Sequence, residues 1–180
     1  MRMADRINIL LFNPKAAWEE ISQEKASSIE VIGRYFLPLL MIPVIATFVS
    51  YGIIGYRVPF FGSIHSIDLG IRSAISVLIT SLAGTLISAL FVDLLTPLFG
   101  SQKNFNKALQ LMVYSYTPGL IGGIFYFYYA TSLLGLILGL YGLYILFLGL
   151  KPMMKIADDR QAAFYIISIV MTIINFSSLL

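Results

Sequence analysis

The chain has 180 residues, of which 58% are apolar and only 12% are charged. An ordinary soluble domain is roughly 45–50% apolar and about 25% charged, so this composition, with a mean hydropathy of +0.86, argues against a soluble enzyme. Uncharged stretches long enough for membrane helices of roughly 20 residues separate the charged segments, which indicates a polytopic membrane protein. The absence of cysteine excludes a disulfide, a thiol nucleophile and a cysteine metal site.

Residues 1–34 hold many of the ionisable side chains and form a cytoplasmic amphipathic segment in this interpretation. Asn13 followed by Pro14 is typical of a helix start. Apolar side chains recur at helical spacing with acidic residues between them, which predicts an amphipathic helix on the cytoplasmic membrane surface. The surface contacts are assigned to Trp18, Ile21 and Lys25. The alternative is that the apolar stripe packs against the ends of the membrane helices, and both arrangements are compatible.

Five transmembrane helices are predicted, so the expected fold is an all-α five-helix bundle. The expected spans are residues 35–55, 73–92, 109–129, 133–150 and 162–180. The uncharged run 108–150 is too long for one crossing at 1.5 Å per residue, so it must fold back. The expected turn is 130–132, directly after an aromatic run typical of a membrane interface.

The basic residues predict the orientation of these helices. Ten of the twelve Lys and Arg residues lie in three segments, the N-terminal segment and the loops that follow the second and fourth spans, whereas Arg57 and Arg72 lie on the other side. The positive-inside rule places the N-terminus in the cytoplasm and the C-terminus outside. Acidic residues are interspersed and no dense basic patch forms, so no nucleic-acid partner is expected despite a pI near 9.1.

Polar stripes on the second and fifth spans suit either close helix packing or a transport path. A proline–glycine break at Pro118, near mid-depth of the third span, permits the same two interpretations. The residues assigned to a path or to helix packing are Thr80, Gly84, Ser88, Thr172 and Asn175. Helix packing is the default for small and weakly polar side chains in a bundle.

Asp93 is the carboxylate of greatest interest, because an intramembrane charge is costly and commonly functional. It follows Arg72 by roughly 31 Å of helix, which places it at the inner interface, in water or paired with Lys103, Lys107 or an N-terminal base. A structural helix-end carboxylate and a proton relay both remain open. His65 is the single histidine, and no catalytic, metal-binding or cofactor-binding constellation is visible, so the expected protein is not an enzyme.

Two ordered motifs resemble the signature of the Yip family of Rab-GTPase-interacting, five-span membrane proteins. They are Asp93-Leu94-Leu95-Thr96-Pro97 and Tyr114-Ser115-Tyr116-Thr117-Pro118, with Asp93, Leu94, Pro97, Tyr114, Ser115 and Pro118 as the matching positions. The resemblance implies a transmembrane Yip domain over residues 35–180 and a cytosolic N-terminus. The chain lacks the long acidic tail of eukaryotic members, and it has Leu95-Thr96 where they have Tyr-Gly. It therefore looks like the compact bacterial branch, which implies an inner-membrane location and no Rab-type GTPase partner.

The expected function is membrane organisation or scaffolding through self-association and partner binding, as in Yip-family membrane trafficking proteins. The expected partners are the lipid bilayer, further copies of the chain and other membrane proteins. The alternative is a transporter, channel or lipid scramblase with a path lined by the second, third and fifth spans.

Overall fold

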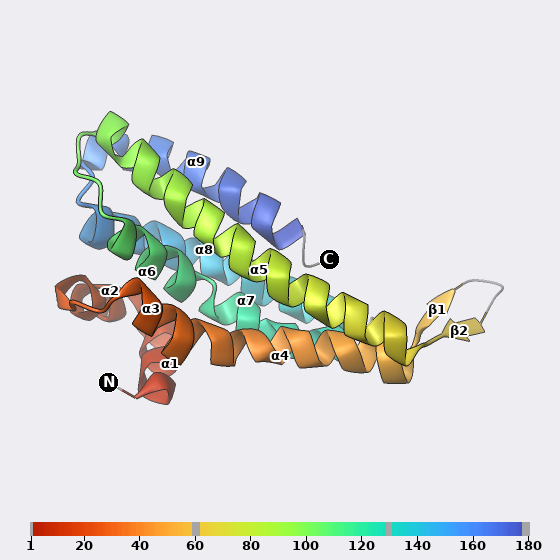
Figure 1. Ribbon diagram of the computed structural model, residues 1–180. Coiled ribbons are helices and arrows are strands. Elements are labelled where there is room, and N and C mark those ends of the chain that lie inside the picture. The colour runs from red at the N-terminus through yellow and green to blue at the C-terminus, as the bar shows by residue number, and fades with distance from the viewer. Residues whose placement is uncertain (1, 59–61, 129–130, 178–180) are drawn as a thin grey trace.

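The computed structural model describes residues 2–58, 62–128 and 131–177, which form an elongated helical bundle (Figure 1). Three short helices cover one end of the bundle and are here called the N-terminal cap: α1 (Met3–Phe12), α2 (Pro14–Gln23) and α3 (Ser28–Val31). Asn13 begins α2, because its side-chain oxygen accepts a hydrogen bond from the Ala16 amide at 3.4 Å and Pro14 occupies the first turn. The predicted helix start at Asn13-Pro14 is therefore confirmed.

A continuous helical run leads from the cap along the length of the bundle. It consists of η1 (Ile32–Phe36), a π-helical turn, then α4 (Leu37–Phe48) and a second π-helical segment, η2 (Val49–Ile54). A short antiparallel hairpin, β1 (Tyr56–Val58) and β2 (Gly62–Ile64), follows and projects from the far end (Figure 1). The sequence did not predict this hairpin, because its strands are too short to show an alternating pattern.

The longest helix, α5 (Ile67–Leu95), returns along α4 to the cap end and is followed by the 3₁₀ turn η3 (Thr96–Phe99). Its 29 residues correspond to about 43 Å of helix. The start of α5 crosses η2 at two glycines, since a Cβ on Gly70 would lie 2.6 Å from the Gly52 Cα. A substituted Gly70 would therefore push the two helices apart.

The predicted third span is not one helix. It is divided into α6 (Phe105–Ser115), α7 (Thr117–Gly122) and the 3₁₀ segment η4 (Gly123–Phe127), with the break at Tyr116. Pro118 lies in the first turn of α7, where it lacks an N–H for the preceding turn. The break that the sequence predicts at Pro118 is thus confirmed, and it divides the predicted span into three helical pieces that end at Phe127.

Two further helices complete the bundle, α8 (Ser132–Met154) and α9 (Asp158–Ser177). The structure therefore contains three helical runs that are long and apolar enough to cross a membrane, Ser28–Ile54, Ile67–Phe99 and Ser132–Met154, among the described residues. The predicted fifth span, 162–180, corresponds to α9, which is not among these three runs, and its last three residues lie outside the described ones. The predicted count of five such helices is not reproduced, although the all-helical bundle is.

Glycines bring α8 into close contact with the broken segment. A Cβ on Gly135 would lie 2.8 Å from the Gly122 carbonyl oxygen, and a Cβ on Gly142 would lie 2.6 Å from the Ser115 carbonyl oxygen. Small residues allow such close approach between helices in membranes. Gly135 and Gly142 therefore serve the close packing of α8 on the broken segment.

The basic segments of the chain gather at one end of the bundle, here called the basic end (Figure 1). Two contacts join them: the Ser28 hydroxyl donates to the Asn106 side chain, and the Ser101 hydroxyl donates to the Met154 carbonyl at 2.5 Å. Arg72, in contrast, lies near the hairpin end of α5. This arrangement agrees with the division of basic residues from which the sequence predicts the membrane orientation.

Candidate functional site

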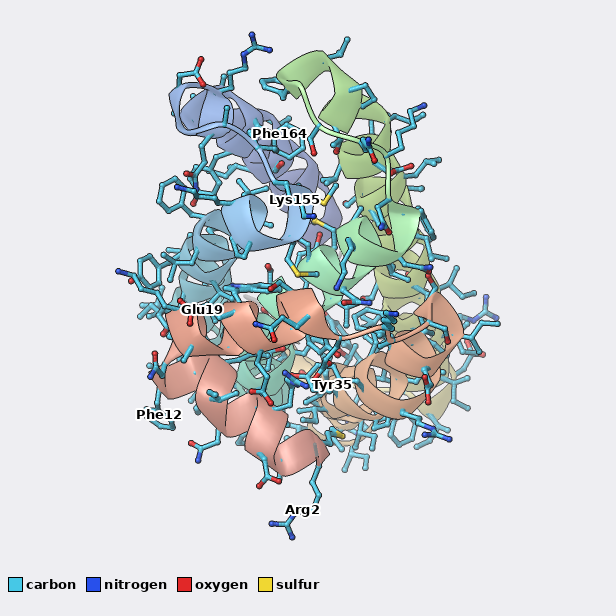
Figure 2. All side chains as sticks on the ribbon, turned by 90° about the vertical axis from the view of Figure 1, so that its left-hand side faces the viewer. Arg2, Phe12, Glu19, Tyr35, Lys155 and Phe164 are labelled. Atoms are coloured by element: carbon cyan, nitrogen blue, oxygen red, sulfur yellow. The ribbon has the colours of Figure 1, made fainter. Side chains whose placement is uncertain are left out.

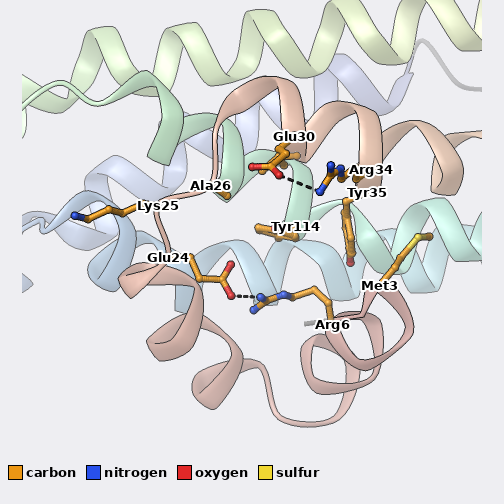
Figure 3. A pocket seen from close by; sticks show the side chains of 10 residues that line it. Met3, Arg6, Glu24, Lys25, Ala26, Glu30, Arg34, Tyr35 and Tyr114 are labelled. Carbon is orange, nitrogen blue, oxygen red and sulfur yellow. Dashed lines mark hydrogen bonds and ion pairs between the residues drawn. The ribbon is translucent and has the colours of Figure 1, made fainter.

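A pocket of about 560 Å³ opens at the basic end, between the N-terminal cap and α6. Figure 3 shows its walls: Met3 and Arg6 come from α1, Glu24 and Lys25 follow α2, and Tyr114 comes from α6. Glu30, Arg34 and Tyr35 of α3 and η1 also line it. Tyr114 is thus the one position of the predicted family motif that reaches this pocket.

Arg6 is the buried cation of the pocket. It lies on α1, on the helix face that packs against the rest of the protein. Only 5% of the residue is exposed. One terminal nitrogen, Nη2, donates to the Glu24 carboxylate, and the guanidinium carbon lies 5.7 Å from the centre of the Tyr114 ring. The other terminal nitrogen, Nη1, is buried and has no hydrogen-bond partner among the described residues.

Two tyrosines connect the pocket to the helix break. The Tyr35 and Tyr114 rings meet edge to face with centroids 4.8 Å apart. The Tyr35 hydroxyl shares a hydrogen bond of 2.8 Å with the Thr117 hydroxyl, directly after the break at Tyr116. Displacement of either ring would therefore be transmitted to the start of α7.

Side chains of α6 hold the end of α2 in place beside the pocket. The Lys107 ammonium donates to the carbonyl oxygens of Ile21, Ser22 and Glu24 at 3.2, 2.9 and 2.8 Å. The last carbonyls of a helix lack the usual intrahelical partners and suit a cation, and the Ile21 carbonyl also accepts from the Glu24 amide at 3.1 Å. The side-chain amide of Gln110 donates to the Ala26 carbonyl at 2.9 Å, which fixes the next turn of chain.

Trp18 fixes the cap to α8. Its indole nitrogen donates to the Ile145 carbonyl at 2.9 Å, and its ring occupies the space beside Gly149, where a Cβ would lie 2.5 Å away. Trp18 and Ile21 are both fully buried, so their predicted role at the membrane surface is wrong. Their apolar stripe packs on the bundle, as in the alternative, because the bundle itself offers an apolar surface. Lys25 remains exposed.

The exposed side chains of the cap lie on its outer surface, as the end-on view in Figure 2 shows for Arg2, Phe12 and Glu19. Phe12 is 83% exposed and Ile29 is 85% exposed. These two side chains are therefore the large apolar groups through which the cap can contact a surface outside the protein.

The motif residues after the second span do not converge on the pocket. Asp93 is buried at 8% exposure, and its Oδ1 has no hydrogen-bond partner among the described residues. Leu94 and Pro97 are exposed, and the Thr96 hydroxyl, at the start of η3, donates to the Val92 carbonyl in the last turn of α5. The suggested pairing of Asp93 with Lys107 does not occur, because the Lys107 ammonium holds the α2 carbonyls.

The remaining motif residues form the packed centre of the bundle. Ser115 and Pro118 are buried, and the Ser115 carbonyl faces Gly142. The Ser115 hydroxyl oxygen is buried with no hydrogen-bond partner among the described residues. These two positions shape the contact between the broken segment and α8.

The residues assigned to a path or to helix packing are distributed around α5 and α9. Ser88 is buried, Thr80 and Gly84 are half-buried, and the Thr80 hydroxyl donates to the Ser76 carbonyl of its own helix. A strict fourfold spacing turns around a helix of 3.6 residues per turn, so the buried polar face instead includes Ser81 and Thr85. Residues 172 and 175 lie on α9, and their side chains are outside the described ones.

Sequence reasoning missed the buried ion pair and the carbonyl clamp of Lys107. Arg6 stands one turn before Leu10 on the apolar face of α1, and a cation on such a face was the signal that could have identified it. Glu24 and Lys107 gave no comparable signal, because their partners come from distant parts of the chain.

The helical bundle, with its apolar outer surface and three long apolar helices, is an integral membrane protein. A family model of the Yip1 domain matches residues 7–180, so the chain belongs to the Yip family. Comparison with curated proteins gives no significant match, and neither does comparison with solved structures.

Proposed function

We propose that this Yip-family protein is a non-enzymatic membrane scaffold that crosses the bilayer five times and organises the membrane through self-association and partner binding. Its N-terminus faces the cytoplasm, its C-terminus lies outside, and its location is the bacterial inner membrane. The broken segment α6–α7–η4 and the helix α9 supply the third and fifth crossings. The positive-inside rule supports this orientation, because the basic segments lie together at one end.

The observation that carries the proposal is the closed packing around the helix break. A conducting path requires space at mid-depth beside polar side chains, but Ser88, Ser115 and Thr117 are buried by neighbouring helices. The Gly142 contact brings α8 against the backbone of α6 at this level. A rigid, closed interior with an apolar exterior suits a protein that acts through its surfaces.

The placement of the polar and charged residues supports the non-enzymatic part of the proposal. Asp68, the acidic neighbour of His65, bonds to Arg72 at 2.8 Å and is thereby engaged elsewhere. Among the described residues, no group of His, Asp and Glu is placed to hold a metal ion. The pocket at the basic end contains cations, carboxylates and tyrosines but no paired nucleophile and base.

Reconstitution into liposomes tests the closed interior. The purified chain should give no lipid scrambling and no ion leak above empty liposomes, and the double variant Asp93→Asn, Tyr114→Phe should behave identically. Flux in the wild type that this variant loses would reject the scaffold and favour the transport alternative.

Cysteine crosslinking in native membranes tests self-association, since the chain contains no cysteine of its own. Single cysteines are introduced at exposed positions of α5, α8 and α9, for example at Ile79, Ile137 and Ile166. At least one of these variants should crosslink to a dimer. Leu146→Cys, which is fully buried, is the matched control and should remain monomeric. Monomers at every exposed position would contradict self-association.

A further inference from the structure

The pocket at the basic end has the size and the lining of a binding site for a small charged group. Its volume of about 560 Å³ lies within the range of roughly 300–1,000 Å³ that is typical of small-molecule sites. Figure 3 shows Arg6 of α1 and Glu24 of the chain after α2 directed at each other, with Glu30 and Arg34 paired beside Tyr114 and Lys25 directed outward. Neither the family match nor the proposed scaffold assigns a ligand to this pocket.

The unpartnered donor of Arg6 indicates which chemical group the pocket would bind. A buried guanidinium nitrogen without an acceptor is costly, and natural proteins satisfy nearly all such donors. Glu24 occupies Nη2, whereas Nη1 has no acceptor among the described residues. Arginine prefers planar, two-pronged contacts with the oxygens of carboxylates and phosphates. An oxyanion is therefore the group that completes this site.

The charges at the mouth also favour an anion. Lys25 and Arg34 are exposed at the rim, and Arg34 bonds to Glu30 at 3.1 Å. With Arg6, these residues place three cations against two carboxylates around one pocket. One positive charge thus remains uncompensated at the mouth.

The position of the pocket indicates where its ligand comes from. Arg34 is the last charged residue before the uncharged stretch of the candidate membrane helix Ser28–Ile54, which places the pocket at the height of the lipid headgroups. Met3 and Val31 add an apolar side to the lining. A ligand with a phosphate and an apolar continuation would match both halves of the site.

We propose that this pocket binds the phosphate group of a phospholipid headgroup from the leaflet at the basic end, with Arg6 Nη1 as its buried donor. Lys25 and Arg34 attract the phosphate at the rim. Tyr114 forms the floor, and the Tyr35–Thr117 hydrogen bond connects the occupied pocket to the start of α7. This inference goes beyond the proposed function and does not depend on it.

Titration of the purified full chain in an uncharged detergent with dioctanoyl phosphatidylglycerol tests the proposal. The wild type should bind this lipid saturably, whereas dioctanoylglycerol, which lacks phosphate, should bind at least about tenfold more weakly. Arg6→Gln should weaken the Kd for the lipid about tenfold or more, because a charge-assisted contact is lost. Arg72→Gln, at the opposite end of the bundle, should leave it unchanged.

Two further variants separate ligand binding from folding. Glu24→Gln removes the ion pair but keeps the guanidinium, so it should retain lipid binding even where stability falls. The double variant Lys25→Gln, Arg34→Gln alters only exposed residues and should weaken the lipid Kd several-fold. If Arg6→Gln does not fold, the lipid Kd of this double variant tests the proposal in its place.

An unchanged Kd in a folded Arg6→Gln protein, or in the double variant if Arg6→Gln does not fold, would overturn the proposal. Equal affinity for dioctanoylglycerol would do the same. Inorganic phosphate is the third ligand of the titration. Binding of inorganic phosphate as tight as that of the lipid would reject the lipid assignment in favour of a free anion. Because these measurements use detergent and no flux, their failure is distinguishable from failure of the scaffold.

Discussion

Replacement of Trp18 by alanine is expected to be one of the most damaging single changes in the N-terminal cap. The indole is fully buried, touches α8 beside Gly149 and lies 6.3 Å from the Tyr114 ring, centroid to centroid. Truncation of a buried Trp to Ala costs about 3–5 kcal/mol. In a chain of this length that loss lowers the melting temperature by about 6–20 °C.

A second variant separates packing from hydrogen bonding at the same position. Trp18→Phe keeps most of the ring but removes the donor to the Ile145 carbonyl, so it should cost about 1 kcal/mol for the hydrogen bond and melt between the wild type and Trp18→Ala. Soluble, monodisperse protein remaining after heating in detergent, measured by size-exclusion chromatography, gives the melting temperature without requiring a tryptophan signal.

Phe12→Ala is the matched control, because Phe12 is a large apolar residue of the same cap that is 83% exposed. It should melt within about 2 °C of the wild type, since exposed substitutions change stability by roughly 0.5 kcal/mol or less. The reasoning would be refuted if Trp18→Ala melted like the wild type. An equal loss in Phe12→Ala would also refute it, because the damage would then not depend on burial.

Three other substitutions test the fold with the same melting assay. Gly142→Ala should lower stability by about 1–3 kcal/mol, because its Cβ would lie 2.6 Å from a backbone oxygen of α6. Gly33→Ala is the control and should not lower stability, because its Cβ would have no neighbour within 4 Å. Equal melting temperatures of the two variants would contradict the close approach of α8 to α6. Lys107→Met should lower stability by about 1.5–3 kcal/mol, because it removes the donor to the carbonyls at the end of α2. Lys103→Met is the control, because Lys103 is exposed. A Lys107→Met protein as stable as the wild type would show that these hydrogen bonds are dispensable. Asp93→Asn should raise the melting temperature, because an amide costs less to bury than a carboxylate with an unpartnered oxygen, and a decrease would reveal a partner for the charge.

Much of the helical architecture follows from local patterns in the sequence. Asn13-Pro14 marks the start of α2, and the uncharged runs mark α4, α5 and α8, because both signals depend on neighbouring residues. Pro118 likewise marks the break of the third segment. The composition indicates a membrane protein for the same reason, since the bilayer requires long apolar helices.

The candidate site could not be predicted in this way, because its contacts join distant parts of the chain. Arg6 meets Glu24 across the cap, and Trp18 reaches Ile145 on α8. An amphipathic stripe shows that a helix face is buried, but not whether lipid or protein covers it. The membrane-surface assignment of Trp18 failed at this point, because the bundle presents an apolar surface of its own.

In the proposed five-span arrangement, the division of the third segment at Tyr116 has a consequence for how the chain enters the membrane. An isolated segment with a broken helix and a 3₁₀ end would expose unpaired backbone groups to lipid, at several kcal/mol for each group. Residues 105–127 are therefore not expected to insert into the bilayer on their own. They require α4 and α8 beside them before release into the bilayer, which makes this part of the protein a unit of biosynthesis rather than a series of separately inserted helices.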